Sequence, residues 1–168
     1  MNLEHAAQLA PIATAAIALI AACVALRSMY LQRDIARRRA AIDFFIKTDV
    51  DGAMTDSYHK FKRHTCDLSA LMKLPNFHTT EAYADVRHYL NICELIAVGI
   101  NHGAFSERVS IAYWGDWLPK VYDISVPLIT FVRQTPGEGR ATTYDELEVL
   151  CQRWGARAEA RPSSLPRS

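Results

Sequence analysis

The N-terminal part of the chain lacks charge. Residues 1–26 contain no lysine or arginine, and residues 6–26 contain no charged side chain at all. A helix rises about 1.5 Å per residue, so this uncharged run would be roughly 31 Å long and would match the ~30 Å hydrocarbon core of a bilayer. Five arginines then follow: Arg27, Arg33, Arg37, Arg38 and Arg39. The positive-inside rule therefore predicts one membrane span over residues 1–26, with the N-terminus outside and the remainder in the cytoplasm.

Three other structures could produce the same uncharged run. A cleaved secretory signal carries positive charge before a shorter apolar stretch of about 7–15 residues, whereas here the arginines come after it. The sequence Ile-Ala-Ala-Cys at 20–23 resembles a bacterial lipobox that would lipidate Cys23, but no basic segment precedes it. A buried helix of a soluble protein is the third alternative, yet apolar residues surround this axis without a polar face. The pattern favours a membrane span in a bacterial inner membrane, with the lipid bilayer as a partner.

Small side chains recur every four residues in this span. They are Ala10, Thr14, Ala18 and Ala22. Transmembrane helices associate through small residues, because lipid solvates large apolar side chains as well as another protein does. The stripe is therefore a candidate seam for a homo-oligomer. The alternative is that so many alanines align on one side by chance.

Strong charge of either sign is also missing, because the whole chain has a net charge of only +1. Residues 27–64 hold nine Lys or Arg against five Asp, whereas residues 65–168 hold ten basic against twelve acidic residues. The basic excess thus adjoins the predicted span, where each cation near an anionic leaflet gains about 1 kcal/mol. Nucleic-acid binding needs a basic face on the folded domain itself, so we expect no nucleic-acid partner.

No strand signal of useful length appears. Gly and Pro positions, capping residues and apolar periodicity predict helices over 26–47, 53–64, 80–103, 106–119, 120–134 and 142–154, with a break at 49–52. We therefore predict an all-α fold: an N-terminal transmembrane helix (1–26) continues into a basic juxtamembrane helix (27–52), a cytoplasmic helical domain (53–155) and a disordered tail (156–168). The clearest helix, 80–103, places seven apolar residues in one arc as its core face: Val86, Tyr89, Leu90, Cys93, Ile96, Ala97 and Ile100.

Cysteine and histidine do not form a recognisable metal site. The four cysteines are far apart and no CxxC occurs, so we expect free thiols, with Cys93 and Cys151 in the core. His59, His64 and Cys66 lie near one another in the sequence, but their spacing fits neither common zinc arrangement. We expect neither a metal nor a cofactor.

One polar group remains on the clearest helix. Arg87, Asn91 and Glu94 are spaced by four and then three residues, which places them on one face, opposite Leu90 and Ile96. Such a group could read a ligand, contact a neighbouring protomer or form a solvated surface network. Arg133 is a candidate partner for Glu94.

The cytoplasmic part resembles a known family through several packing motifs. These are AIDFF at 41–45, YLNICELIAVGI at 89–100, GAF at 103–105, FVR at 131–133, YDELE at 144–148 and RW at 153–154. They resemble DUF4760, a family of small bacterial and phage-borne membrane proteins with a domain of unknown function. The plan is also similar to that of the membrane accessory protein of Cas13b CRISPR loci, a ring-forming pore protein used in antiphage defence. That second similarity rests on architecture alone.

Catalytic motifs are missing as well. The sequence contains no G-x-S-x-G, P-loop, GxGxxG or HExxH. The Arg and His pair of HEPN ribonucleases, which are also helical, is absent because Ile92, Cys93 and Glu94 occupy the positions where a histidine would follow Arg87. We therefore expect a non-enzyme, with no catalytic residues.

Two functions fit these observations. The first is a membrane-anchored, self-associating helical protein that acts as an effector of antiphage defence or toxicity by perturbing the inner membrane. The second is a single-pass anchor that recruits a cytoplasmic partner protein to the membrane. An enzyme with an unrecognised site ranks below both.

Overall fold

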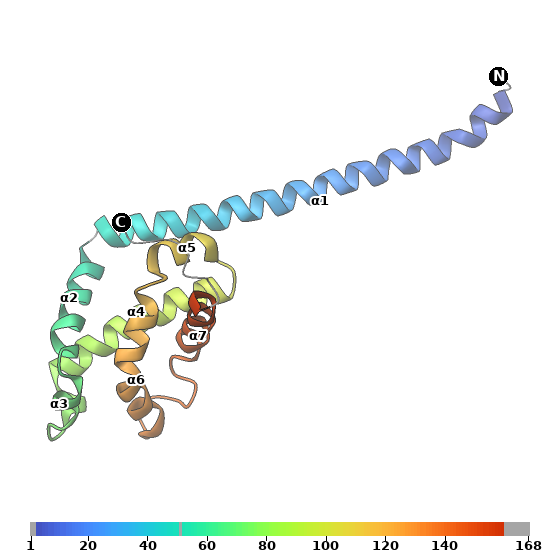
Figure 1. The fold of residues 1–168 in the computed structure, drawn as a ribbon. Coiled ribbons are helices and arrows are strands. Elements are labelled where there is room, and N and C mark those ends of the chain that lie inside the picture. Colours follow the sequence, from blue (N-terminus) through green and yellow to red (C-terminus); the bar gives the residue numbers. More distant parts are fainter. Residues whose placement is uncertain (1–2, 51, 160–168) are drawn as a thin grey trace.

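The described part of the chain is entirely helical. The computed structural model describes the backbone of residues 3–50 and 52–159, and the side chains of 14–48 and 52–157. These residues form seven α-helices and one short 3-10 helix and no strand, which confirms the predicted all-α fold (Figure 1). The elements are α1 (Leu3–Val50), α2 (Ala53–Thr65), α3 (Leu68–Met72), η1 (Phe77–Thr79), α4 (Glu81–Asn101), α5 (Glu107–Trp114), α6 (Leu118–Gln134) and α7 (Asp145–Glu159).

The first helix extends far beyond the rest of the molecule. α1 has 48 residues, which corresponds to about 72 Å, and its N-terminal part points away from the bundle (Figure 1). Every residue from 14 to 40 is exposed, because no other described part of the chain covers this part of the helix. By length and composition α1 can cross a membrane, and the apolar stretch that allows this lies within Thr14–Thr48. The apolar part of α1 continues as one helix into the arginine-bearing part, as the sequence predicted.

The other end of α1 belongs to the core of the helical domain. Ala41 and Phe45 are buried, and the Phe45 ring stacks on Tyr113 of α5 with the ring centroids 4.8 Å apart. The backbone N–H of Ser106 donates to the carbonyl of Arg37 at 3.3 Å. The domain therefore includes the last turns of α1, upstream of the boundary expected at residue 53.

α4 is the central helix of the bundle. α2 and α7 pack against it, and α6 packs against α7. All seven residues of the expected core face are buried, together with Tyr83. The side chain of Thr80 caps the helix by accepting from the N–H of Tyr83, and Gly103 follows the C-terminus with φ +70, a conformation that glycine adopts without strain. The expected bounds of this helix are confirmed to within two residues.

Three elements differ from the sequence-based expectation. α3 occupies a stretch expected to be irregular, because five residues are too few to show a helical period. Pro119 was expected to end a helix that includes Trp117, but it lies in the first turn of α6, where a missing N–H has no cost. α7 continues past Gly155 to Glu159, so the start of the expected disordered tail at 156 is wrong. Residues 160–168 lie outside the described residues.

Candidate functional site

The polar group of α4 faces the loop between α6 and α7. Arg87 donates through Nη1 to the carbonyl of Glu138 at 2.8 Å and to the hydroxyl of Tyr83 at 3.2 Å. The Tyr83 hydroxyl donates in turn to the Glu138 carboxylate. Burial, followed by this hydrogen bond, raises the pKa of Tyr83 to about 12. Arg87 therefore fastens the loop to α4 instead of reaching into solvent.

The second member of the group holds a residue with a strained backbone. Asn91 Oδ1 accepts from the hydroxyl of Tyr144 at 3.0 Å, and Tyr144 is almost completely buried. Tyr144 has φ +68, which is unfavourable for a side chain of this size and persists only where the surroundings hold it in place. Asn91 supplies part of that support, directly before α7 begins.

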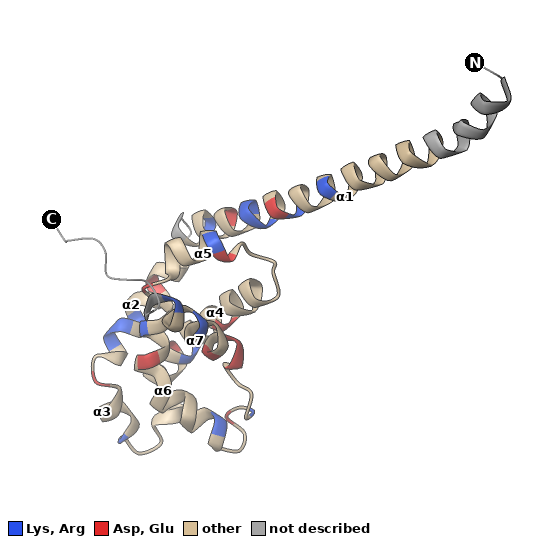
Figure 2. Cartoon of the chain, turned by 45° about the vertical axis from the view of Figure 1, so that its right-hand side comes forward, with Lys and Arg blue, Asp and Glu red and all other residues tan. Residues whose placement is uncertain are grey.

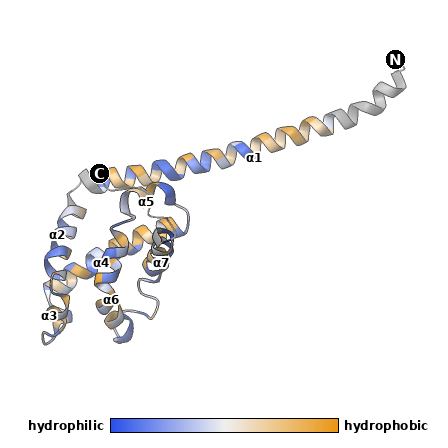
Figure 3. Cartoon of the chain, viewed as in Figure 1, coloured by the Kyte–Doolittle hydropathy of each residue, from blue (hydrophilic) through white to orange (hydrophobic). Residues whose placement is uncertain are grey.

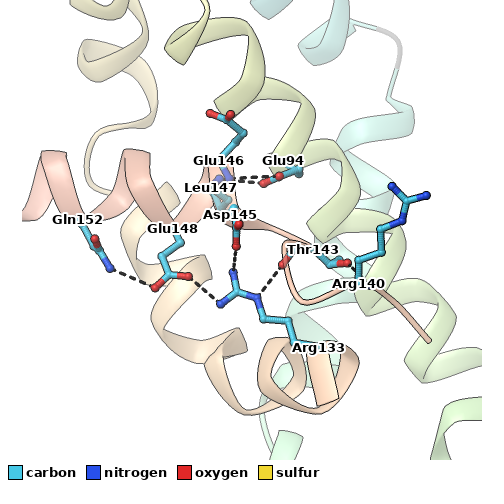
Figure 4. Close-up of polar contacts among 9 residues, drawn as sticks. All are labelled: Glu94, Arg133, Arg140, Thr143, Asp145, Glu146, Leu147, Glu148 and Gln152. Carbon is cyan, nitrogen blue, oxygen red and sulfur yellow. Dashed lines mark hydrogen bonds and ion pairs between the residues drawn. The ribbon is translucent and has the colours of Figure 1, made fainter. Parts of the chain in front are cut away.

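The third member caps α7. Glu94 accepts from the backbone N–H groups of Leu147 at 2.8 Å and Glu146 at 3.3 Å (Figure 4). The first N–H groups of a helix have no acceptor within the helix, and the positive end of its dipole favours a carboxylate. Burial raises the pKa of Glu94, and the two backbone hydrogen bonds act in the opposite direction. Glu94 thus supplies from another helix the cap that α7 requires.

Arg133 of α6 reaches the same turn from the other side. It donates to the carbonyl of Thr143 at 2.9 Å, to Asp145 at 2.9 Å and to Glu148 at 2.8 Å (Figure 4). The hydrogen bond from Arg133 lowers the pKa of Glu148. The partner of Arg133 is therefore the acidic first turn of α7, and not Glu94 as the sequence suggested, because Glu94 is turned toward the backbone N–H groups.

These contacts form one unit, which we call the α7 clamp: Arg87, Asn91, Glu94, Arg133, Glu138, Tyr144, Asp145 and Glu148. The clamp joins α4, α6 and the start of α7. The sequence grouped its α4 members correctly but missed Tyr144, Glu138 and the acidic turn. The acidic residues at 145, 146 and 148 are the sequence feature that could have revealed these contacts. Acidic side chains in the first turn of a helix are common and can pair with a basic side chain such as Arg133. The polar groups of the clamp bond to one another and to the backbone of α7, so the clamp positions this helix.

A second candidate site is an aromatic pocket of about 330 Å³ where the end of α1 meets α2, α4 and the α5–α6 junction. Its lining carries no charge and consists of Thr48, Met54, Thr55, Tyr58, Tyr89, Tyr113, Trp114 and Trp117. Trp117 donates through Nε1 to the Tyr89 hydroxyl at 3.0 Å, and the Tyr58 ring meets Trp117 edge to face. Tyr113 is 52% exposed at the rim. Such a pocket suits an apolar or aromatic group.

The cysteines and histidines are dispersed. Among the described residues no three His, Cys, Asp or Glu side chains are close enough to hold a metal ion. His64 lies 3.3 Å from Asp85 of α4, and the exposed Cys66 thiol donates to the carbonyl of Lys62. Cys93 and Cys151 are buried core thiols, and burial raises the pKa of both, that of Cys151 to about 12.

The residues that the sequence predicts to lie in or beside a membrane are all on α1. Ala18 and Ala22 are exposed, as is Thr14, whereas the side chain of Ala10 lies outside the described residues. Figure 3 shows the apolar N-terminal part of the helix giving way to a polar segment, and Figure 2 shows charges of both signs on that segment.

The arginines of that segment have mixed surroundings. Arg38 pairs with Asp34, and Arg39 lies 3.7 Å from Asp43. The Arg37 guanidinium packs against the turn at Gly103, so it contacts the domain. Arg27 and Arg33 are exposed.

Comparison with known proteins gives a family but no activity. No curated protein and no solved structure matches the chain. The model of DUF4760, a domain of unknown function, matches residues 13–154, from the apolar part of α1 to Trp154 of α7. The match covers both α1 and the clamped bundle, and on this evidence the chain belongs to the DUF4760 family.

Proposed function

We propose that this protein is a single-pass membrane protein that self-associates on the cytoplasmic face of a bacterial inner membrane and perturbs that membrane as an effector of antiphage defence or toxicity. The observation that carries the proposal is the exposed apolar part of α1. Ile17, Leu19, Ile20 and Val24 are each more than 60% exposed in the single chain. Leaving a large apolar side chain in water costs about 1.5–3 kcal/mol, whereas a bilayer would cover all four.

The charges support the orientation. The arginine-bearing part of α1 follows the apolar part and precedes the domain, so the domain would lie on the cytoplasmic side under the positive-inside rule. Arg27 is the first charge after the span, and about 15 Å of helix separates it from Arg37, where contacts with the domain begin. The domain would therefore stand a short distance from the membrane surface.

The effector role requires more than one copy. A single helix in lipid cannot enclose water, since its own backbone and side chains are surrounded by lipid alone. Any loss of the membrane barrier must therefore come from several α1 helices acting together. The domain, which shares Ala41 and Phe45 with α1, would set the spacing of those helices.

The proposal is tested by topology and by depolarisation. A reporter fused after Glu159 should be active in the cytoplasm, and the protein should stay in the membrane pellet after carbonate extraction. Expression of the full chain should depolarise the cells, whereas deletion of residues 1–26 should abolish depolarisation while leaving the clamped bundle folded. Depolarisation that persists in the deletion variant would contradict the proposal and would place the activity in the cytoplasmic domain.

The aromatic pocket favours a second candidate function, that of an anchor for a cytoplasmic partner. A partner could insert one apolar or aromatic side chain between Tyr113 and Trp117, at the pocket rim. Tyr113→Ala would then abolish the phenotype of the expressed protein, with no change in membrane insertion. As a matched control, Val149→Ala removes an equally exposed side chain far from the pocket and should have no effect.

A further inference from the structure

An apolar repeat runs along the face of α1 that the domain leaves open. Its members are spaced alternately by four and three residues: Ile17, Ala21, Val24, Ser28, Leu31, Ile35, Arg38 and Ile42. In heptad notation these are successive d and a positions, the pattern of a helix that packs in a left-handed coiled coil. Only Ser28 and Arg38 interrupt the apolar character. We call this set the α1 heptad face.

The domain does not use this face. Ala41, Phe44 and Phe45 of α1 meet the domain and lie about 60° to 160° around the helix axis from Ile42. Arg37, which contacts the turn at Gly103, lies within the same range of angles, so the domain packs on the adjoining side of the helix. Every member of the α1 heptad face is exposed in the single chain. The face is therefore free for another molecule from Ile17 as far as Ile42, where the domain begins to cover the helix.

Lipid cannot cover the second half of this face. Leu31, Ile35 and Ile42 are 54%, 63% and 46% exposed, and all three lie beyond Arg27, on the polar segment of α1. In water, exposed aliphatic side chains in a regular repeat along one helix face require a protein partner. The partner must present the same periodicity over both the membrane and the aqueous part.

A second copy of this chain meets that requirement. Copies anchored in one membrane with the same orientation present their α1 helices parallel and in register. In a parallel coiled coil, residues at g positions lie opposite the following e positions of the neighbour. Here g and e are Asp34 and Arg39, which are opposite in charge. The ion pairs that these residues make within the chain are largely exposed and weak, so exchanging them costs little.

We propose that residues 17–42 of α1 form a parallel, in-register coiled coil with a second copy of this chain, within the bilayer as far as Leu26 and in the cytoplasm beyond it. This inference rests on the self-association in the proposed function and specifies its seam. It differs from the small-residue stripe, because Ala18 and Ala22 fall at e and b positions, off the α1 heptad face. Arg38 is the one charged residue at a d position, and its ion pair with Asp34 is one of the two that would be exchanged.

The test is cysteine cross-linking of the full chain in native membranes. The exposed Cys23 and Cys66 are first replaced by Ala and Ser. Single cysteines are then placed on the face (Ser28→Cys, Ile35→Cys) and off it (Ala18→Cys, Ala36→Cys), and mild oxidation is followed by electrophoresis. We expect at least a tenfold higher yield of disulfide-linked dimer from the two positions on the face.

A second arm measures the size of the detergent-solubilised protein. Leu31→Glu and Ile35→Glu should shift a discrete oligomer to monomer, whereas Tyr30→Glu, which adds the same charge at an exposed c position, should not. These side chains touch no core residue, so retained tryptophan fluorescence will show that the domain remains folded. The double variant Ala18→Leu and Ala22→Leu should leave the oligomer intact.

The possible failures are distinguishable. Cross-linking at Ala18→Cys but not at Ile35→Cys would overturn the heptad seam and favour the small-residue stripe, with self-association retained. A monomer with no cross-link at any position would overturn both this inference and the self-association on which it rests.

Discussion

Replacement of Glu94 by alanine would remove the cap of α7 without touching α7 itself. The carboxylate accepts from the N–H groups of Leu147 and Glu146, at the position where the helix has no acceptor of its own. Truncation at Glu94 leaves both groups facing the space it occupied. We therefore expect α7 to undock more often, while α1, α2 and the core of α4 remain in place.

The magnitude follows from the two bonds. A hydrogen bond to a charged group contributes about 1.5–3 kcal/mol, and the 2.8 Å bond to Leu147 is the stronger of the pair. Burial of the carboxylate acts against it, as the raised pKa of Glu94 shows. A net loss of about 2 kcal/mol results, which corresponds to a roughly 30-fold larger undocked population. Glu94→Gln keeps one acceptor oxygen and should lose about half as much free energy.

Limited proteolysis of the full chain in mild detergent measures that population. Arg140 is exposed in the loop before α7, and trypsin cleavage after it should accelerate when α7 undocks. Trp154, which is buried on α7, should report the same event by fluorescence. Leu95→Ala is the matched control, since it truncates the neighbouring, exposed residue of α4. Equal cleavage rates for Glu94→Ala and Leu95→Ala would refute the capping role.

Two further changes test the clamp and the core. Arg133 lowers the pKa of Glu148 in the folded protein. The ionised Glu148 therefore stabilises the fold at pH values above its ordinary pKa of 4.5, and this stabilisation is lost as the pH falls through the lower pKa of the folded state. Arg133→Met should therefore be less stable than wild type at pH 7, and the difference in thermal stability should shrink below about pH 4.5; a constant difference would contradict the ion pair. Leu147→Ala, at a completely buried position, should cost about 2–5 kcal/mol in chemical denaturation, whereas the exposed Val149→Ala should cost under about 0.5.

The spacing of apolar residues and the positions of glycines made most of the fold predictable. The core face of α4 follows from its 3.6-residue pattern, and the breaks at Gly52 and Gly103 follow from glycines with positive φ. α3 was not predictable in this way because it is shorter than two turns. Pro119 is compatible with a helix end and with a helix start, so the sequence alone did not decide between them. In the structure it lies in the first turn of α6, and Trp117 directly before that helix donates to the Tyr89 hydroxyl.

The residues of the clamp on α4 were predictable from the sequence, but their partners were not. Spacing placed Arg87, Asn91 and Glu94 on one face, but spacing does not reveal what packs against that face. The partners of Glu94 are backbone N–H groups, which carry no sequence signal. Tyr144 adopts a left-handed backbone conformation, which tyrosine disfavours, so local sequence preferences do not predict this conformation. Tertiary contacts decide such positions.

α1 joins its apolar N-terminal part to the domain as one continuous helix. It contains neither Gly nor Pro between residues 12 and 50, so it offers no site at which a sharp kink would normally form. Ala41 and Phe45 lie in the domain core, and Thr48 lines the aromatic pocket. A rotation of α1 about its axis would have to carry these residues with it or break their packing. In the proposed assembly, the arrangement of the α1 helices would therefore fix the orientation of the helical domains.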